Sequence, residues 1–397
     1  MVPSVTVTPP VPIRTADTRP AARRPFAPLW AWGGPPVLAY LAGHLLFALA
    51  GALTGFDWLD TGSRIRWDGN IYLDIAKTGY YAAPCSEINP SVLKPGAFCG
   101  NAGWFPLFPY VVLGLTKSTG LGLDLTGVLV AEVCALGMLI VVWRLLGARL
   151  NAASLGCLAV AAALPSGVYF HATHPMSLSV LLALVTFALL VRGRWAIAGL
   201  TGAATAMAYP LAVLLAPAAV AFLLILPGRR SWRRLAAAAY VGGLTCAGTL
   251  AVFGLLYLTT GRFDAYLLIQ TSNYGHGVHD PVRTLVTLFS RPSLAVSAEL
   301  LFSISLVALV LLAVHRPAAR ERVTTLDRAL ATTYGPLLLI APLVVGANVA
   351  QFRSHTLMVP LVLVLRHLRT PVVVGLATVA VPLAFVMATL FLKGVLV

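Results

Sequence analysis

The sequence predicts an all-α, polytopic membrane protein. Of its 397 residues, 59% are hydrophobic and 10% are charged, and the mean hydropathy is +0.87. Soluble domains carry about 25% charged residues, so these values exclude a soluble fold. Apolar segments recur along the chain and are separated by short loops that hold arginines. Because basic residues in such loops set membrane orientation, the net charge of +15 does not indicate a nucleic-acid partner.

Residues 1–35 are rich in Pro, Thr, Ala and Arg and lack apolar periodicity. Such a segment cannot bury a core, so we expect a disordered cytosolic tail, followed by a transmembrane domain over residues 36–397. A membrane-spanning helix needs about 20 apolar residues. The sequence offers eleven candidate spans, at 36–54, 125–147, 151–170, 175–192, 195–210, 211–227, 235–258, 293–314, 329–347, 356–369 and 371–395.

The segment 105–116, FPLFPYVVLGLT, is too short to cross the membrane and holds two prolines. We interpret it as a re-entrant or interfacial helix that begins and ends on the same side. With the N-terminus inside, 18 of the 28 lysines and arginines then fall inside. If the segment crossed, every later basic cluster would lie outside, against the positive-inside rule. We therefore expect a plasma-membrane protein with a cytoplasmic N-terminus and an extracytoplasmic C-terminus.

The first outer loop, residues 55–104, contains the stretch WDGNIYLDIAKTGY at 67–80. Trp67, Ile71, Ile75 and Thr78 recur at helical spacing, which predicts an amphipathic helix. Asp68 falls in its first turn, where an acid suits the positive end of the helix dipole. An acid at the membrane rim is also a functional candidate, and position alone leaves both interpretations open. Two cysteines of this loop, at 85 and 99, can form a disulfide if the loop faces an oxidising compartment.

Polar residues gather in four outer segments: the loop 55–104, the turn 169–175, the loop 259–292 and the stretch 348–355. Six of the eight histidines lie in or beside these segments or in an outer half-span. Contact with water alone does not require that concentration. We expect the segments to form the wall of an outward-facing polar cavity.

Three stretches carry a family resemblance: RWDGNIYLDIAKTGY at 66–80, FPLFP at 105–109 and LPSGVYFHATHPMSLSVLLAL at 164–184. Their order and separation resemble the PIG-V-type mannosyltransferases, the second mannosyltransferases of GPI-anchor assembly and their bacterial relatives. The resemblance implies a GT-C glycosyltransferase fold, a bundle of about eleven transmembrane helices with an amphipathic helix in the first outer loop. The chain departs from the family pattern at Thr173-His174-Pro175-Met176, in place of Tyr-Ser-Glu-Ser, and at Tyr209-Pro210, in place of an arginine motif.

The resemblance also implies an activity on the outer face of the membrane. GT-C enzymes take a sugar, here most simply mannose, from a polyprenyl-phosphate donor, which agrees with the lack of a nucleotide-binding motif in the sequence. The acceptor is a hydroxyl of a lipid, glycan or protein. Asp68 is the expected general base, because a carboxylate can remove the hydroxyl proton as the oxygen attacks the anomeric carbon. A single displacement inverts that carbon.

The leaving phosphate needs cationic or hydrogen-bonding groups. We assign the donor's phosphate and sugar to Arg353, His355, His171, His174, Lys94, Trp67 and Tyr209. Arg353 can equally be an interfacial anchor, and the two histidines of the 169–175 turn can be a hydrogen-bonded pair at a helix end. Glu132 and Glu299 lie within spans. Each can be a functional acid or a structural acid that is paired inside the bundle.

No cofactor is expected. The run Gly275-His276-Gly277-Val278-His279-Asp280 offers three ligands for a divalent metal, but a flexible substrate-binding loop explains its glycines equally well.

Two other functions remain open. A transporter or flippase for a lipid-linked or anionic substrate would show inverted repeats and helices broken near mid-membrane. A non-catalytic scaffold related to the transferases is favoured by the missing acid and arginine of the family pattern.

Overall fold

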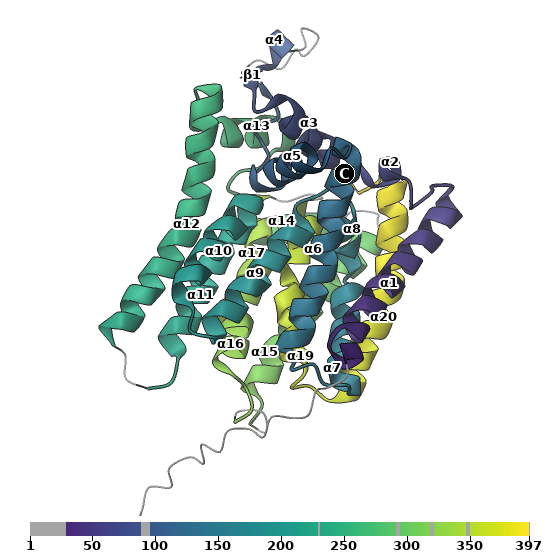
Figure 1. Ribbon diagram of the computed structural model, residues 1–397, viewed down its shortest axis with the longest axis vertical. Coiled ribbons are helices and arrows are strands. Elements are labelled where there is room, and N and C mark those ends of the chain that lie inside the picture. The colour runs from purple at the N-terminus through teal and green to yellow at the C-terminus, as the bar shows by residue number, and fades with distance from the viewer. Residues whose placement is uncertain are drawn as a thin grey trace, which may run out of the picture.

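The computed structural model describes residues 29–88, 96–228, 231–290, 294–317, 321–346 and 350–396. Helices make up most of this part of the chain (Figure 1). Its only strands, β1 (Ala82–Pro84) and β2 (Phe98–Gly100), form one antiparallel pair in which Ala83 faces Cys99. The all-α class is confirmed. Residues 1–28 of the expected tail lie outside the described residues, and α1 begins at Leu29, before the expected start of the transmembrane domain at residue 36.

Several helices are long and apolar enough to cross a membrane. Among the described residues there are six: α1 (Leu29–Thr54, its span counted from Gly33), α6 (Leu123–Leu145), α12 (Trp232–Thr260), α15 (Leu294–His315), the continuous helix Thr325–Val345 and α20 (Thr370–Leu392). A bent pair adds a seventh if it is one span, since α7 (Ala152–Ala162) meets the segment Pro165–His171 at 56°. The chain is therefore a multi-pass membrane protein.

The remaining candidate spans coincide with shorter apolar helices. These are α9 (Met176–Val191), α10 (Trp195–Ala208), the segment Pro210–Ile225, which joins the 3-10 turn η2 (Pro210–Leu214) to α11 (Leu215–Ile225), and the segment Gln351–Leu365. The last combines α18 (Ala350–His355), η5 (Thr356–Leu361) and α19 (Val362–Leu365). All eleven expected segments are thus helical, but only six or seven satisfy the length and composition of a full span.

Prolines set several helix boundaries that bear on the cavity. Tyr209 is extended, with φ −154° and ψ 141°, and Pro210 starts the following 3-10 turn. A residue before proline is pushed out of the helical region, so α10 must end there. Pro175 similarly occupies the N-cap of α9, directly after His174. Each break turns a side chain that precedes proline away from the regular helix surface.

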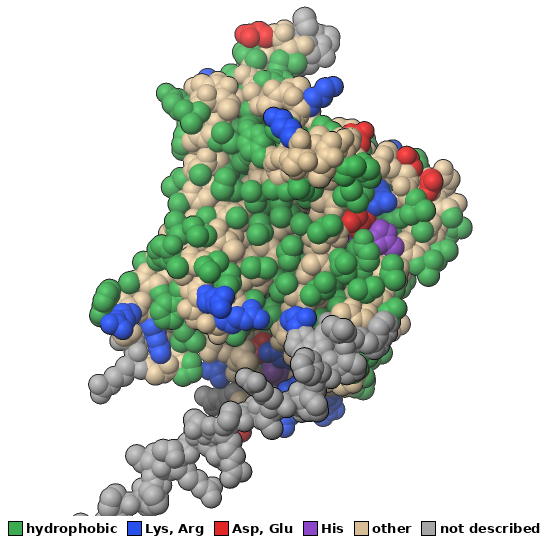
Figure 2. Space-filling view, viewed as in Figure 1, with side chains coloured by type: hydrophobic (Ala, Val, Ile, Leu, Met, Phe, Trp, Pro, Cys, Tyr) green, Lys and Arg blue, Asp and Glu red, His purple; other side chains and the backbone are tan. Residues whose placement is uncertain are grey.

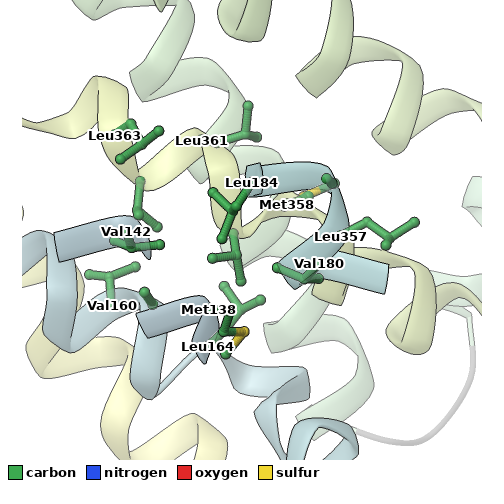
Figure 3. Packing of buried hydrophobic residues seen from close by; sticks show 14 of the residues in the cluster. Met138, Val142, Val160, Leu164, Val180, Leu184, Leu357, Met358, Leu361 and Leu363 are labelled. Atoms are coloured by element: carbon green, nitrogen blue, oxygen red, sulfur yellow. The ribbon is translucent and has the colours of Figure 1, made fainter. Parts of the chain in front are cut away.

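The core joins helices that are distant in sequence (Figure 3). Met138 and Val142 of α6, Val180 of α9 and Leu361 of η5 pack in one buried cluster. Small residues allow close helix contact, as is usual in membranes: a Cβ added at Gly248 of α12 would lie 2.3 Å from the Ala203 carbonyl oxygen of α10. The packing brings the Gln351–Leu365 segment into the centre of the bundle.

Short elements cover the upper end of the bundle in Figure 1. They are α2 (Thr61–Arg64), α3 (Asp68–Thr78), α4 (Cys85–Ile88), α5 (Leu107–Thr119), α13 (Ala265–Tyr274) and α14 (Pro281–Phe289). The expected helix after Trp67 is present as α3. With 13 residues, α5 is shorter than the roughly 20 needed to span, and it packs on α3 and α6. A disulfide joins Cys85 to Cys99 beside the β1–β2 pair.

Candidate functional site

Asp68 and Arg353 form an ion pair between the first turn of α3 and α18. The Arg353 Nη1 donates to the Asp68 Oδ2, and the two side chains are only 14% and 13% exposed. The guanidinium also lies over the Tyr169 ring, with 5.9 Å from its carbon to the ring centroid. Removing one member of a buried ion pair leaves the other charge buried without a partner. The pair therefore ties the loop 55–104 to α18, near the end of the chain.

The backbone at Trp67 has an unusual conformation that fixes the start of α3. Its φ is 48° and its ψ is −111°, values that an L-residue adopts only under strain. The Asn70 N–H donates to the Trp67 carbonyl at 3.0 Å and closes the turn. Nearby, a Cβ added at Gly69 would lie 3.1 Å from the Thr173 carbonyl oxygen. This close approach sets Asp68 against the turn that carries His174.

A cavity of about 530 Å³ opens beside the ion pair. This volume lies within the range of about 300–1,000 Å³ that is usual for small-ligand sites. Its lining comprises Trp67, Asp68, Ile71, Tyr72, Gly103, Trp104, Phe105, His174, Met176, Tyr209, Pro210, Tyr266, Gln270, Asn273, Tyr274, His276 and Arg353. Seven of these seventeen residues carry Phe, Tyr or Trp rings, and a few polar side chains lie among them.

Five of the residues selected from the sequence line this cavity: Trp67, Asp68, His174, Tyr209 and Arg353. His171 and His355 are not in its lining, because each is bound to a buried glutamate elsewhere in the bundle. Lys94 lies outside the described residues. Any part that the two other histidines take in donor binding would have to be indirect, and it stays a prediction.

Buried polar atoms without partners surround the ion pair. His174 is buried among the rings of Tyr72, Tyr169 and Phe391. Burial lowers the pKa of His174 to about 3, so its imidazole is neutral. In the part of the chain that the structure describes, no partner bonds its Nδ1, the Arg353 Nε or the Tyr169 hydroxyl. Each such atom costs about 1–3 kcal/mol unless a water or ligand bonds it.

Glu132 is the centre of a second polar cluster, in the middle of α6. Its Oε1 accepts from Arg64 Nη1 at 2.6 Å, and its Oε2 lies 2.9 Å from His44 Nε2 and 2.8 Å from His171 Nδ1. The Tyr40 hydroxyl donates to Oε2 at 2.9 Å. The cluster also connects two segments that lead to the cavity, the end of α2 and the turn 169–175. They are joined because the Arg64 carbonyl accepts the Thr173 N–H at 3.1 Å.

His44, Glu132 and His171 could by spacing hold a metal ion, because their ligand atoms lie within 4.8 Å of one another. Metal-bound histidines usually donate their second N–H to a carbonyl or carboxylate. Here the Trp58 Nε1–H donates to His44 Nδ1 at 3.3 Å. That bond puts the His44 proton on Nε2, which faces Glu132. The donor set therefore fits a complete hydrogen-bonded network and does not fit a metal.

Glu299 forms a similar pair with His355. The His355 Nδ1 lies 2.9 Å from Glu299 Oε1, and the Ser166 and Ser303 hydroxyls donate to the same oxygen at 3.1 and 3.2 Å. Both Glu299 and His355 are 1% exposed. Both intramembrane glutamates are thus paired acids, one of the two interpretations that the sequence left open.

The run from Gly275 to Asp280 does not gather three ligands at one point. His276 lines the cavity, whereas the His279 Nε2 lies 3.0 Å from the Gly275 carbonyl oxygen. The Asp280 carboxylate caps α14 by accepting the Val282 N–H at 2.8 Å. These contacts favour the loop interpretation of the run.

Helix α13 supplies one wall of the cavity and belongs to the loop 259–292, which the sequence analysis expected in that wall without giving its single residues a binding role. Tyr266, Gln270, Asn273 and Tyr274 all line it. Their spacing of three and four residues places them on neighbouring positions of one helix surface. That spacing was visible in the sequence, but nothing local showed which partner α13 would face.

Comparison of the chain with models of known protein families and with curated proteins finds no match.

Proposed function

We propose that this protein is a membrane glycosyltransferase of the GT-C, PIG-V-like kind. It transfers a sugar, mannose in the simplest case, from a polyprenyl-phosphate donor to a hydroxyl acceptor, and it inverts the anomeric carbon. The observation that carries the proposal is the Asp68–Arg353 pair in the wall of a cavity rich in aromatic side chains. A carboxylate and a guanidinium side by side are the two groups that this reaction needs.

The donor phosphate and Asp68 compete for the same guanidinium. When the phosphate binds Arg353, the Asp68 carboxylate loses its positive partner and becomes a stronger base. It then takes the proton of the acceptor hydroxyl, whose oxygen bonds to the anomeric carbon while the bond from that carbon to the phosphate oxygen breaks. The leaving polyprenyl phosphate takes the electron pair, and Arg353 stabilises its charge.

We further propose eleven crossings, a cytoplasmic N-terminus and an extracytoplasmic cavity in the plasma membrane. In support, basic side chains cluster at the lower end of the face drawn in Figure 2, and most of its acidic ones lie at the upper end, where the cavity-lining helices are. The positive-inside rule then makes the lower end cytoplasmic. The Cys85–Cys99 disulfide lies at the upper end, as an oxidising compartment allows.

Transport of a lipid-linked or anionic substrate is the second candidate. The feature that favours it is the segment Gln351–Leu365, in which the α-helix changes to a 3-10 helix at Thr356–Leu361 and neither polar side-chain atom of Gln351 has a partner among the described residues. Broken helices with free polar groups line the substrate path of many transporters. The position of the cavity at one end of the bundle favours the transferase instead.

The deciding experiment uses the purified protein in nanodiscs with a bacterial lipid extract as acceptor source. We expect radiolabelled mannose to be transferred from polyprenyl-phosphate-mannose and not from GDP-mannose, with an inverted linkage in the product. Transfer from the nucleotide sugar alone would contradict the proposed donor. The transporter would be favoured by two results together. No polyprenyl-phosphate sugar would support transfer, and the labelled lipid would move across the bilayer of liposomes that hold the protein.

A further inference from the structure

Two amide side chains of α13, Gln270 and Asn273, lie three residues apart on one helix surface and line the cavity. Both are tied to the backbone of the first outer loop. The Gln270 Nε2 donates to the Gly103 carbonyl at 2.6 Å, and the Asn273 Nδ2 donates to the Phe98 carbonyl at 2.7 Å.

These bonds fix which way each amide points. A backbone carbonyl can only accept, so the NH₂ group must face it and the amide oxygen must lie on the other side. Among the described residues, no group donates to the Gln270 Oε1 or the Asn273 Oδ1. Each anchored amide therefore presents a free acceptor oxygen.

Close packing between α13 and the loop 55–104 holds these amides in place. A Cβ added at Gly103 would lie 2.8 Å from the Ile269 Cγ2 and 3.1 Å from the Gln270 Nε2, so only glycine lets α13 come this close. On the other side, Phe98 adjoins Cys99, which the disulfide holds to Cys85. The acceptor oxygens are thus held in place before any ligand arrives.

The two sides of the cavity differ in what they can bind. Arg353 and His174 offer a positive charge and a hydrogen-bonding ring, whereas the described residues on the α13 side contribute no carboxylate, lysine or arginine to the lining. Two fixed carbonyl-type oxygens repel an anion and accept from a hydroxyl. Beside them, Trp104 and Tyr274 pack edge to face, with 5.7 Å between their ring centroids, and offer apolar faces.

We propose that Gln270 and Asn273 determine specificity by accepting hydrogen bonds from hydroxyl groups of a neutral polyol held against α13. This inference rests on the proposed transferase function and refines it. The anionic part of a bound ligand goes to Arg353, and the neutral, hydroxyl-bearing part goes to the α13 wall.

The test measures binding, without any transfer reaction. Saturation-transfer NMR on the protein in nanodiscs would follow methyl α-mannopyranoside, methyl α-glucopyranoside and glycerol as neutral probes, and mannose 6-phosphate as the anionic one. Gln270→Met removes the acceptor and the anchor. Gln270→Lys keeps a donor for the Gly103 carbonyl, removes the acceptor and adds a positive charge, which a neutral probe does not oppose.

We expect both variants to bind the preferred neutral probe about tenfold more weakly, the loss of roughly one hydrogen bond. The matched control is Thr271→Ala, because Thr271 is exposed on the same helix and bonds only the backbone carbonyls of its own turn; it should bind as the wild type does. Binding of mannose 6-phosphate should be lost in the Arg353→Gln variant.

Wild-type affinity in both Gln270 variants would overturn the inference, and so would the absence of saturable binding of every neutral probe to the wild type. The outcomes separate the two proposals. Unchanged binding in the variants, alongside transfer that depends on Asp68, would remove only this inference. Hydroxyl-specific binding in a protein that transfers no sugar would remove only the proposed reaction.

Discussion

Arg353 pairs with Asp68 although 285 positions of the chain separate them. Both side chains are largely buried, and the pair connects the strained start of α3 to α18, near the end of the chain. Because the guanidinium already bonds the carboxylate through Nη1, a phosphate that enters the cavity would compete with Asp68 for it. This exchange is the step that would couple donor binding to release of the base.

The ion pair makes a first prediction about stability. Asp68→Ala or Arg353→Met alone should lower the free energy of unfolding by about 1–3 kcal/mol, because the remaining group loses its hydrogen-bond partner. The double variant should be less destabilised than the sum of the two single variants. Thermal unfolding in one detergent provides the measurement, and strict additivity would show that the two side chains do not interact.

The backbone of Trp67 makes a second prediction. Trp67→Gly and Trp67→Ala remove the same ring, but only glycine accepts a φ of 48° with a ψ of −111° at little cost. The glycine variant should therefore be more stable than the alanine variant by about 1 kcal/mol. At Ala76, inside α3, a change to glycine should instead destabilise the protein. An alanine variant at least as stable as the glycine variant would contradict the strained conformation.

The third prediction concerns pH. The pKa of His174 falls from 6.5 to about 3 because the ring is buried, so the unfolded chain binds a proton there that the folded protein does not. Stability should then decrease on acidification from about pH 6.5 downward, over the range between the two pKa values. Unfolding midpoints from pH 7 to 4 should fall less steeply in His174→Phe, since that ring cannot titrate. Equal slopes would show that His174 does not contribute.

Glu132 provides the fourth prediction. Glu132→Gln leaves the buried Arg64 without its carboxylate and should cost about 3 kcal/mol. Because Arg64 and His171 both lead into cavity segments, sugar transfer should fall as well. Arg64→Gln combined with Glu132→Gln should recover part of the stability, which unfolding measurements can detect. Treatment with EDTA should leave the wild type unchanged, and a stability loss on chelation would instead indicate a bound metal.

The sequence predicted what depends on local pattern. Helix α3 follows from the spacing of Trp67, Ile71 and Ile75, and the membrane class follows from composition. The Asp68 and Arg353 candidates were found because polar groups at helix ends near the membrane rim are conspicuous. Their pairing could not be predicted, because a contact between residues so far apart in the chain has no signal in the local sequence pattern.

Buried partners were the second limit of the sequence. His171 and His355 were assigned to the donor phosphate, but Glu132 and Glu299 bind them within the bundle. Which acid meets which histidine depends on helix packing. The count of eleven spans stays a prediction for a related reason: the turns at Pro165 and Pro210 and the 3-10 stretch at Thr356 make several helices shorter than the apolar segments that contain them.

The most direct test of the account compares sugar transfer by the wild type, Asp68→Asn and Asp264→Asn. Asp264 is the matched control, because it is an exposed acid of the same end that pairs with an arginine, Arg262, and does not line the cavity. We predict that Asp68→Asn loses about 10²–10⁴-fold in transfer rate, the usual contribution of a general base, while Asp264→Asn matches the wild type. Equal rates for the wild type and Asp68→Asn would contradict the central claim.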